Sequence, residues 1–341
     1  MMPILAIVVY IGCYTDAVHT NGLRAIDLDL KSGAMTHLAE YPADNPVYLA
    51  RGADGVVYSN WGGGLASFRC DGARVTRLDT IDLGYRAMCH VSASADGGRV
   101  NWASYTDGQA GSVAVTNGHF GAVTAHCHRG KGPNLPRQDA AHCHQALPTP
   151  DGSGYCVVDL GLDTITTYPR GEVFHTEPAG AGPRHIAFHP NGRLAFCIFE
   201  LKNLLSAYRW SPTGGFEQAD QVGTFAGKPG GATAEGNFGS AVRLAPNTDK
   251  VVVSNRGENS LVAFAVDAET GKLTFASRTF LDGDWPRDFI FVSADIALAM
   301  MERSHEVISL RYDAASGAFA PLAKLGGFHR PVCALVSSAA R

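Results

Sequence analysis

Short strands of alternating apolar and polar residues recur along the whole chain. Seven of them share one form, as in GLRAIDLDL, TITTYPR and SLVAFAV. Their central residues lie 42, 47, 53, 40, 56 and 46 positions apart. These residues are Ile26, Phe68, Val115, Tyr168, Tyr208, Phe264 and Leu310. A repeat of this length, built from short strands, is typical of the blades of a β-propeller.

Each of these strands belongs to a predicted blade of four strands. A turn and a partner strand follow it, as in GKLTFASRTF, and two more strands precede it, as in HIAFHPNGRLAFCIFE. Connectors such as DAETGK and SPTGG have the chemistry of hairpin turns. The pattern therefore predicts an all-β, seven-bladed propeller with four-stranded antiparallel blades, which fills residues 1–341 as a single domain. No extended helix is predicted, because no capped segment has a helical period of useful length.

The two ends of the chain are expected to meet. The first blade begins at AIVVYIG and lacks one strand, whereas the C-terminal segment RPVCALVSS supplies a spare one. Pairing of the last strand with the first would close the ring and remove the exposed edges. The apolar run over residues 2–11 is too short to span a bilayer and precedes no cleavage-like site, so we interpret it as a buried strand.

Composition narrows the class of function. Only 18% of the 341 residues are charged and the net charge is −4, which argues against a nucleic-acid-binding protein. No stretch is long and apolar enough to indicate a membrane protein. The eight cysteines are scattered, several of them in apolar strands, so we expect reduced core residues and a cytoplasmic location. The oligomeric state cannot be inferred from these features.

Two connections are longer than the others. They cover residues 118–141 and 223–239. Long loops in a compact repeat fold are often functional, and both lead into an inner strand. We therefore expect both to rim one mouth of the central channel, with surface decoration as the alternative.

Arginine recurs where the inner strands are expected to begin. The strings are YRA at 85–87, GPRH at 182–185, WPRD at 285–288 and HRP at 329–331. The arginines are Arg86, Arg184, Arg287 and Arg330. Four guanidinium groups at equivalent heights around a narrow channel would form an anion site. Alternatively, each arginine pairs with a carboxylate between blades, for which Asp284 and Asp288 are available.

Charged residues also end three apolar strands in the middle of the chain. Glu200 ends LAFCIFE, and Arg256 takes the matching place in VVVSNRGENS. Asp159 in CVVDLGLD is assigned to this place one blade earlier. These side chains are predicted to lie beside the channel. Salt bridges between blades are the alternative for Glu200 and Arg256, and capping of a turn is the alternative for Asp159.

Histidine and cysteine alternate in two short clusters, His126-Cys127-His128 and His142-Cys143-His144. Such clusters invite a zinc site, but their spacing fits no standard zinc motif, and we predict no metal. His144 stands at the start of the fourth inner strand. We interpret it as a functional residue at the channel mouth, with a purely structural histidine as the alternative.

Three long strings carry a resemblance to a known family: HCHQALPTPDGSGYCVVDLGLDTITTY, GPRHIAFHPNGRLAFCIFELKNLLSAY and VVVSNRGENSLVAF. They resemble the seven-bladed lactonase family, which includes propeller-type 6-phosphogluconolactonases and a fungal carboxymuconate-lactonizing enzyme. The resemblance spans nearly the whole chain. It is specific over residues 142–265 and looser in blades two and three, where WGGG and YTDGQAG depart from the pattern. It implies an active-site set of His144, Arg184, Glu200 and Arg256.

The predicted activity is hydrolysis of a sugar lactone, either 6-phosphogluconolactone or a related aldonolactone. His144 or Glu200 would activate water as the general base, and Arg184 or Arg256 would stabilise the oxyanion. No G-x-S-x-G motif is present, so a serine-based acyl-enzyme is not favoured. Further substrate contacts are assigned to Arg86, His185, Arg287 and Arg330. The chain has only seven lysines and no dense basic loop, which leaves open whether the substrate is phosphorylated.

Two other functions fit the same pattern. A cycloisomerase would use the same base and arginines to close a lactone from a muconate-type dicarboxylate. A propeller without catalysis would bind a protein or a small ligand instead. The expected partner is a small anionic or sugar lactone, and neither a cofactor, nor nucleic acid, nor a membrane is expected.

Overall fold

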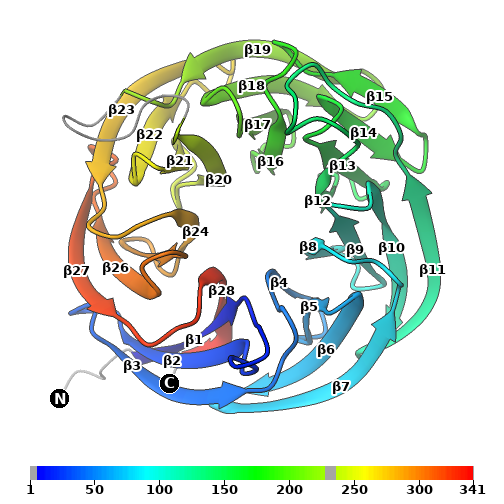
Figure 1. The fold of residues 1–341 in the computed structure, drawn as a ribbon. Coiled ribbons are helices and arrows are strands. Elements are labelled where there is room, and N and C mark those ends of the chain that lie inside the picture. Colours follow the sequence, from blue (N-terminus) through cyan, green and yellow to red (C-terminus); the bar gives the residue numbers. More distant parts are fainter. Residues whose placement is uncertain (1–5, 227–235, 341) are drawn as a thin grey trace.

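Seven four-stranded sheets form a ring around a central channel, and each sheet is one blade of a propeller (Figure 1). The structure is a computed structural model, which describes residues 6–226 and 236–340. All strand pairs within a blade are antiparallel, and the described residues contain no α-helix. The predicted seven-bladed propeller is therefore confirmed.

The strands of each blade run from the channel to the rim (Figure 1). Blade one contains β28 (Pro331–Ala340), β1 (Ala6–Cys13), β2 (Leu23–Asp29) and β3 (Met35–Tyr41). Blade two contains β4 (Leu49–Arg51), β5 (Val57–Trp61), β6 (Gly64–Asp71) and β7 (Arg74–Asp82). Blade three contains β8 (Met88–Ala93), β9 (Arg99–Ser104), β10 (Gln109–Thr116) and β11 (His119–Cys127). Blade four contains β12 (Cys143–Pro148), β13 (Tyr155–Asp159), β14 (Thr164–Tyr168) and β15 (Glu172–His175).

The last three blades follow the same order. Blade five contains β16 (Pro183–Phe188), β17 (Leu194–Phe199), β18 (Leu204–Ser211) and β19 (Gly215–Gly223). Blade six contains β20 (Phe238–Leu244), β21 (Lys250–Arg256), β22 (Ser260–Val266) and β23 (Leu273–Phe280). Blade seven contains β24 (Pro286–Phe291), β25 (Ile296–Met301), β26 (Glu306–Tyr312) and β27 (Phe319–Leu325).

The ring is closed by the two ends of the chain, as the spare C-terminal strand predicts. Strand β28 pairs antiparallel with β1, with Tyr10 opposite Leu335. The innermost strand of blade one therefore comes from the end of the chain and its other three from the beginning. This arrangement removes two sheet edges that would otherwise be free to pair with another chain.

The core consists of apolar layers between neighbouring blades. All seven predicted central residues lie in the third strand of a blade, and six are buried, whereas Tyr168 is half-buried. Phe196 of blade five and Phe264 of blade six, for example, belong to one buried cluster. Burial of each such side chain contributes roughly 1.5–3 kcal/mol, and it also fixes how neighbouring blades face the channel.

The structure corrects one predicted loop. The connection predicted at 118–141 starts too early, because β11 continues to Cys127, so the loop covers residues 128–142. Most of the second predicted loop, residues 227–235, lies outside the described residues. All eight cysteines are free, and five of them are buried as expected, whereas Cys127 is exposed. Within the described part of the chain, no helix is long and apolar enough to cross a membrane.

Candidate active site

Inner strands of several blades carry a β-bulge near their first residue, and the bulge aims one side chain at the channel. The pairing register skips Cys89 in blade three and His144 in blade four. It skips Arg184 in blade five and Arg287 in blade seven in the same way. All four residues line one cavity of about 730 Å³. A bulge re-aims a side chain without ending the strand, which explains how these positions come to share one chamber.

This register corrects the predicted ring of four arginines. Arg184 and Arg287 are equivalent, but their counterpart in blade three is Cys89 rather than Arg86. Arg86 lies three residues earlier, in an exposed turn, although it still reaches the cavity wall. Arg330 precedes β28 and is also exposed, and it is absent from the cavity wall as far as the chain is described. All four arginines stand near the start of an inner strand, but only Arg184 and Arg287 occupy the bulge position itself.

The second layer of the cavity wall comes from the point where the second strand of a blade ends and its turn to the third strand begins. Glu200 directly follows Phe199, the last residue of β17 that pairs with β18. Arg256 holds the same position in blade six, where Asn255 is the last residue paired with β22. Both side chains line the cavity, as the sequence predicts.

Asp159 does not share this position. It is itself the last residue of β13 paired with β14, so its side chain points away from the cavity. Its Oδ1 accepts hydrogen bonds from the backbone N–H groups of His142, Gly161 and Leu162. The assignment of Asp159 to the channel is therefore wrong, and the alternative, turn capping, is confirmed.

Glu200 is buried among three guanidinium groups. Its Oε2 lies 3.0 Å from Arg184 Nε and 2.7 Å from Arg256 Nη2, and its Oε1 accepts a hydrogen bond from Arg137. Burial raises the pKa of Glu200, but the charges of Arg256, Arg184 and Arg137 outweigh it and hold the pKa well below its usual range. Glu200 is thus a permanent carboxylate at neutral pH. Both of its oxygens are engaged by arginines, which leaves His144 as the group better placed to accept a proton.

The two buried arginines beside Glu200 are held by backbone carbonyls of blade six. Arg184 Nη1 donates to Ser240 O at 2.8 Å, and Arg256 Nη2 donates to Gly239 O at 2.9 Å. Burial, together with the charges of Arg256 and Arg287, lowers the pKa of Arg184 to about 9, while Glu200 opposes this shift. Arg184 therefore remains a cation at neutral pH. The ion pair of Glu200 with Arg256 joins blades five and six, whereas its ion pair with Arg184 lies within blade five. Both arginines place fixed positive charge on the cavity wall.

His144 faces the same cavity from blade four. Its ring lies 5.5 Å from that of Tyr105 and 5.2 Å from that of His185, centroid to centroid. Its buried Nδ1 has no hydrogen-bond partner among the described residues. Burial, and next the charge of Arg184, lower the pKa of His144 well below its usual range, so the imidazole is neutral.

The floor of the cavity is a group of packed rings and one ion pair. His185 and Tyr48 both line the cavity, and each packs against the ring of His90. Arg243 binds Asp288 through a contact of 2.7 Å. Tyr48 and Asp288 also line a second cavity of about 390 Å³. This layer therefore divides the channel into two chambers, of which the cavity of about 730 Å³ is called the upper chamber below. Arg184 pairs with Glu200 and Arg287 pairs with Glu302, whereas Asp288 pairs with Arg243.

Sequence reasoning misses several charged residues of this region, among them Arg137 and Glu302 as well as Arg243 of the floor. Arg137 belongs to the loop over residues 128–142 and reaches Glu200 from a distant part of the sequence. Glu302 starts the turn after β25, at the position equivalent to Glu200, and binds Arg287 and Arg330. The turn position that singles out Glu200 could have revealed Glu302, whereas no repeat signal marks Arg137.

The cavity is far more positive than the chain as a whole. Its described lining contains five arginines and three carboxylates, an excess of two positive charges, although the chain has a net charge of −4. A concave site with this imbalance attracts anions and stabilises negative charge that develops within it. The arrangement can therefore bind an anionic group and stabilise an oxyanion, with a neutral imidazole close by.

Comparisons with known proteins agree with this geometry. Residues 8–336 match the family model described as "Lactonase, 7-bladed beta-propeller". The chain is 31% identical over 343 residues to a 6-phosphogluconolactonase of Bacillus subtilis, a match that covers 95% of this chain and 96% of the relative. A crystal structure of a protein from Lactobacillus plantarum has a TM-score of 0.88 at 29% identity, over 97% of this chain and 99% of the other.

A more distant structure shares the fold. The periplasmic gluconolactonase of Pseudomonas aeruginosa superposes with a TM-score of 0.88 at 23% identity, over 98% of this chain and 99% of that protein. The number of blades, the closure by the C-terminal strand and the family match across nearly the whole chain lead to one conclusion. The chain belongs to the seven-bladed β-propeller lactonase family.

Proposed function

We propose that this protein hydrolyses a sugar lactone in the upper chamber of its channel. The observation that carries the proposal is the wall around Glu200, where one carboxylate is outnumbered by buried guanidinium groups. Ester hydrolysis passes through a tetrahedral oxyanion, which such a wall stabilises. The family, and a relative named 6-phosphogluconolactonase, support a lactone as the electrophile.

In the proposed reaction, a water molecule attacks the lactone carbonyl while His144 takes one of its protons. Arg184 and Arg256 stabilise the resulting oxyanion. The ring C–O bond then breaks, and the proton on His144 passes to the departing ring oxygen, which becomes a hydroxyl group. Glu200 acts as a positioning residue, because it aligns both guanidinium groups and both of its carboxylate oxygens are engaged by arginines.

Aromatic rings help to hold this arrangement. The guanidinium carbon of Arg256 lies 5.8 Å from the ring centre of Phe238 and 5.5 Å from that of Trp285. Both rings also line the chamber, so they offer apolar surface to the substrate ring. Cation–π contacts of this kind contribute about 0.5–2 kcal/mol and fix the plane of the guanidinium group.

The remaining predicted contacts receive different roles. Arg287, at a bulge position inside the chamber, and Arg86, on its exposed wall, are proposed to bind a phosphate or carboxylate of the substrate. His185 belongs to the floor and limits how deeply the substrate enters. Arg330 is proposed to act only through Glu302, which it shares with Arg287.

The test is a panel of aldonolactones, each with and without a phosphate group, assayed by acid release in a pH-stat against the spontaneous rate. We expect at least one lactone to be hydrolysed well above background, and the panel also shows whether phosphate improves kcat/KM. Loss of diene absorbance from a muconate-type dicarboxylate, without acid release from any lactone, would instead identify a cycloisomerase. No turnover of either class would overturn the proposal.

A further inference from the structure

One residue from each of the two histidine–cysteine clusters meets a buried carboxylate of blade four. His128 Nδ1 lies 2.8 Å from Asp159 Oδ2, and Cys143 Sγ lies 3.6 Å from the same oxygen. The three side chains are almost completely buried. All three potential ligand atoms lie within 4.8 Å of one another. Imidazole nitrogen, thiolate sulfur and carboxylate oxygen are the donor types that bind zinc in proteins.

The surroundings of the cluster leave these three atoms available. Asp159 Oδ1 is saturated by three backbone N–H groups, which fixes the carboxylate and leaves Oδ2 directed at the other two side chains. His128 Nε2 lies 3.0 Å from the hydroxyl oxygen of Tyr168. A hydroxyl group can either donate or accept, so Tyr168 can support His128 whether Nε2 or Nδ1 carries the proton. A hydrogen-bonded second nitrogen is a usual feature of histidines that bind metals.

The spacing also suits a small tetrahedral ion. With Zn–S of about 2.3 Å and Zn–O of about 2.0 Å, tetrahedral ligands place sulfur and oxygen about 3.5 Å apart, and nitrogen and oxygen about 3.3 Å apart. The separations here are 3.6 Å and 2.8 Å. The sulfur–oxygen separation thus lies close to the tetrahedral value, whereas the His128 ring would have to move away from Asp159 to admit an ion.

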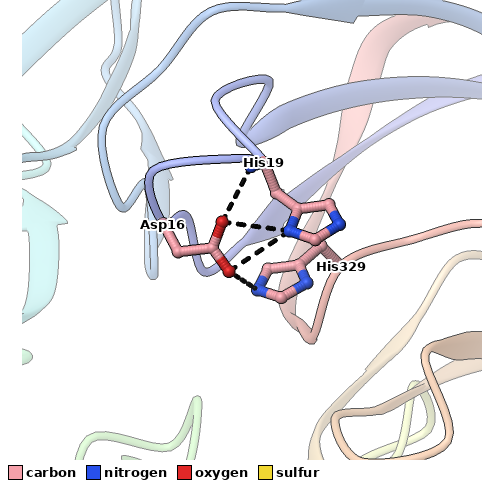
Figure 2. Close-up of side chains that lie close together, drawn as sticks. All are labelled: Asp16, His19 and His329. Carbon is pink, nitrogen blue, oxygen red and sulfur yellow. Dashed lines mark hydrogen bonds and ion pairs between the residues drawn. The ribbon is translucent and has the colours of Figure 1, made fainter.

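A second cluster of potential ligands fits a metal less well. Asp16, His19 and His329 lie together at the surface of blade one, as Figure 2 shows. The two imidazole rings are stacked at 3.9 Å with an angle of only 5° between their planes. A metal must lie close to the plane of each imidazole that binds it, and two parallel stacked rings cannot both meet this condition without turning. The rings instead share hydrogen bonds to Asp16.

We propose that His128, Cys143 and Asp159 form a binding site for one divalent metal ion of the zinc class. On binding, the thiol proton of Cys143 leaves for solvent, Asp159 binds through Oδ2, and His128 binds through Nδ1 with its proton on Nε2. The thiolate and the carboxylate then balance the two charges of the ion. Three protein ligands leave a fourth position for a water molecule.

The proposed site would fasten a loop that reaches the upper chamber. His128 begins the connection over residues 128–142, whereas Cys143 and Asp159 belong to blade four. Arg137 extends from this same connection to Glu200. A metal ion would thus anchor the base of the loop to blade four, and the inference does not depend on the reaction proposed for the chamber.

The experiment is a titration of the full chain with Co²⁺ and Zn²⁺. Every sample carries His19→Ala and His329→Ala, which remove the surface cluster, and Cys127→Ser, which removes the exposed thiol beside His128. We expect one equivalent of Co²⁺ to produce a thiolate-to-cobalt charge-transfer band in the near ultraviolet. Zn²⁺ should displace it and should raise the melting temperature.

Two further substitutions decide whether the band comes from the proposed site. Cys143→Ala should abolish the band and weaken Zn²⁺ binding at least about tenfold, and His128→Gln should weaken binding to a similar degree. Cys156→Ala removes another buried free thiol, from β13, and should change neither. Circular dichroism confirms that each variant is folded. A missing band, or a band that persists in folded Cys143→Ala, would overturn the proposal.

Discussion

Glu200 and Glu302 occupy the same position of the repeat, yet their surroundings differ. Each directly follows the last residue of the second strand that pairs with the third, in blades five and seven respectively. Both carboxylates are buried. Glu200 binds three arginines, two of which are themselves buried, whereas Glu302 binds the partly buried Arg287 and the half-exposed Arg330.

The difference lies in what the neighbouring blade supplies. Beside Glu200, the equivalent turn of blade six carries Arg256, and the bulge of blade five carries Arg184. Beside Glu302, the second cation comes from the exposed turn before β28 and lies with its guanidinium carbon 4.3 Å from the ring centre of Tyr14. The same repeat position therefore forms a buried charged wall in one blade and a partly solvent-exposed group of ion pairs in another.

The largest effect should come from removing the charge of Glu200. Glu200→Gln leaves Arg184 and Arg256 buried without a counter-ion, and breaking a buried pair in this way costs about 3 kcal/mol or more. We expect a loss of this size in the free energy of unfolding at neutral pH, measured by urea denaturation. A loss below about 1 kcal/mol would show that the ion pairs of Glu200 are screened by solvent as strongly as those of Glu302.

The pH dependence of stability should sharpen the same contrast. Because the folded state holds the pKa of Glu200 well below 4.5, this carboxylate contributes stability above pH 4.5. That contribution is lost as the pH falls through the pKa of the folded state. The wild-type protein should therefore lose its advantage over Glu200→Gln in acid, as measured by urea denaturation between neutral pH and acidic pH. A constant difference down to the lowest pH at which both proteins fold would contradict this origin.

Removal of the charge of Glu302 should have a smaller effect. Arg330 is half-exposed and regains water when its partner is lost, so Glu302→Gln is expected to cost about 1 kcal/mol. The measurement is the same denaturation experiment, with Arg330→Met as the matched removal of the other partner. If Glu302→Gln destabilises as much as Glu200→Gln, the distinction between the two carboxylates fails.

The sequence predicts the blades well because their pattern is local. Strand alternation and turn residues mark every blade, and positions such as Phe264 and Leu310 fall in the expected strands. The site depends on finer detail. One unpaired residue decides that Cys89, and not Arg86, corresponds to Arg184, and one position separates Asp159 from the places of Glu200 and Arg256.

Contacts made by loops are not encoded in the repeat at all. Arg137 reaches Glu200 because a loop between blades three and four folds over the chamber, and its local sequence carries no periodic signal. The contact between His128, Cys143 and Asp159 could not be predicted from the repeat either. His128 and Cys143 belong to two separate histidine–cysteine clusters, and nothing in the sequence indicates that these clusters lie together. Such contacts depend on the path of the connecting loop, which the repeat pattern does not describe.

The most direct test of the central claim is the rate of lactone hydrolysis by Arg184→Met, compared with Arg330→Met and the wild-type protein. If the wall around Glu200 stabilises the oxyanion, Arg184→Met should lose about a hundredfold or more in kcat, as expected for the loss of one oxyanion donor. Arg330→Met should stay within a few-fold of the wild-type rate. Equal rates for folded Arg184→Met and wild-type protein would contradict the account.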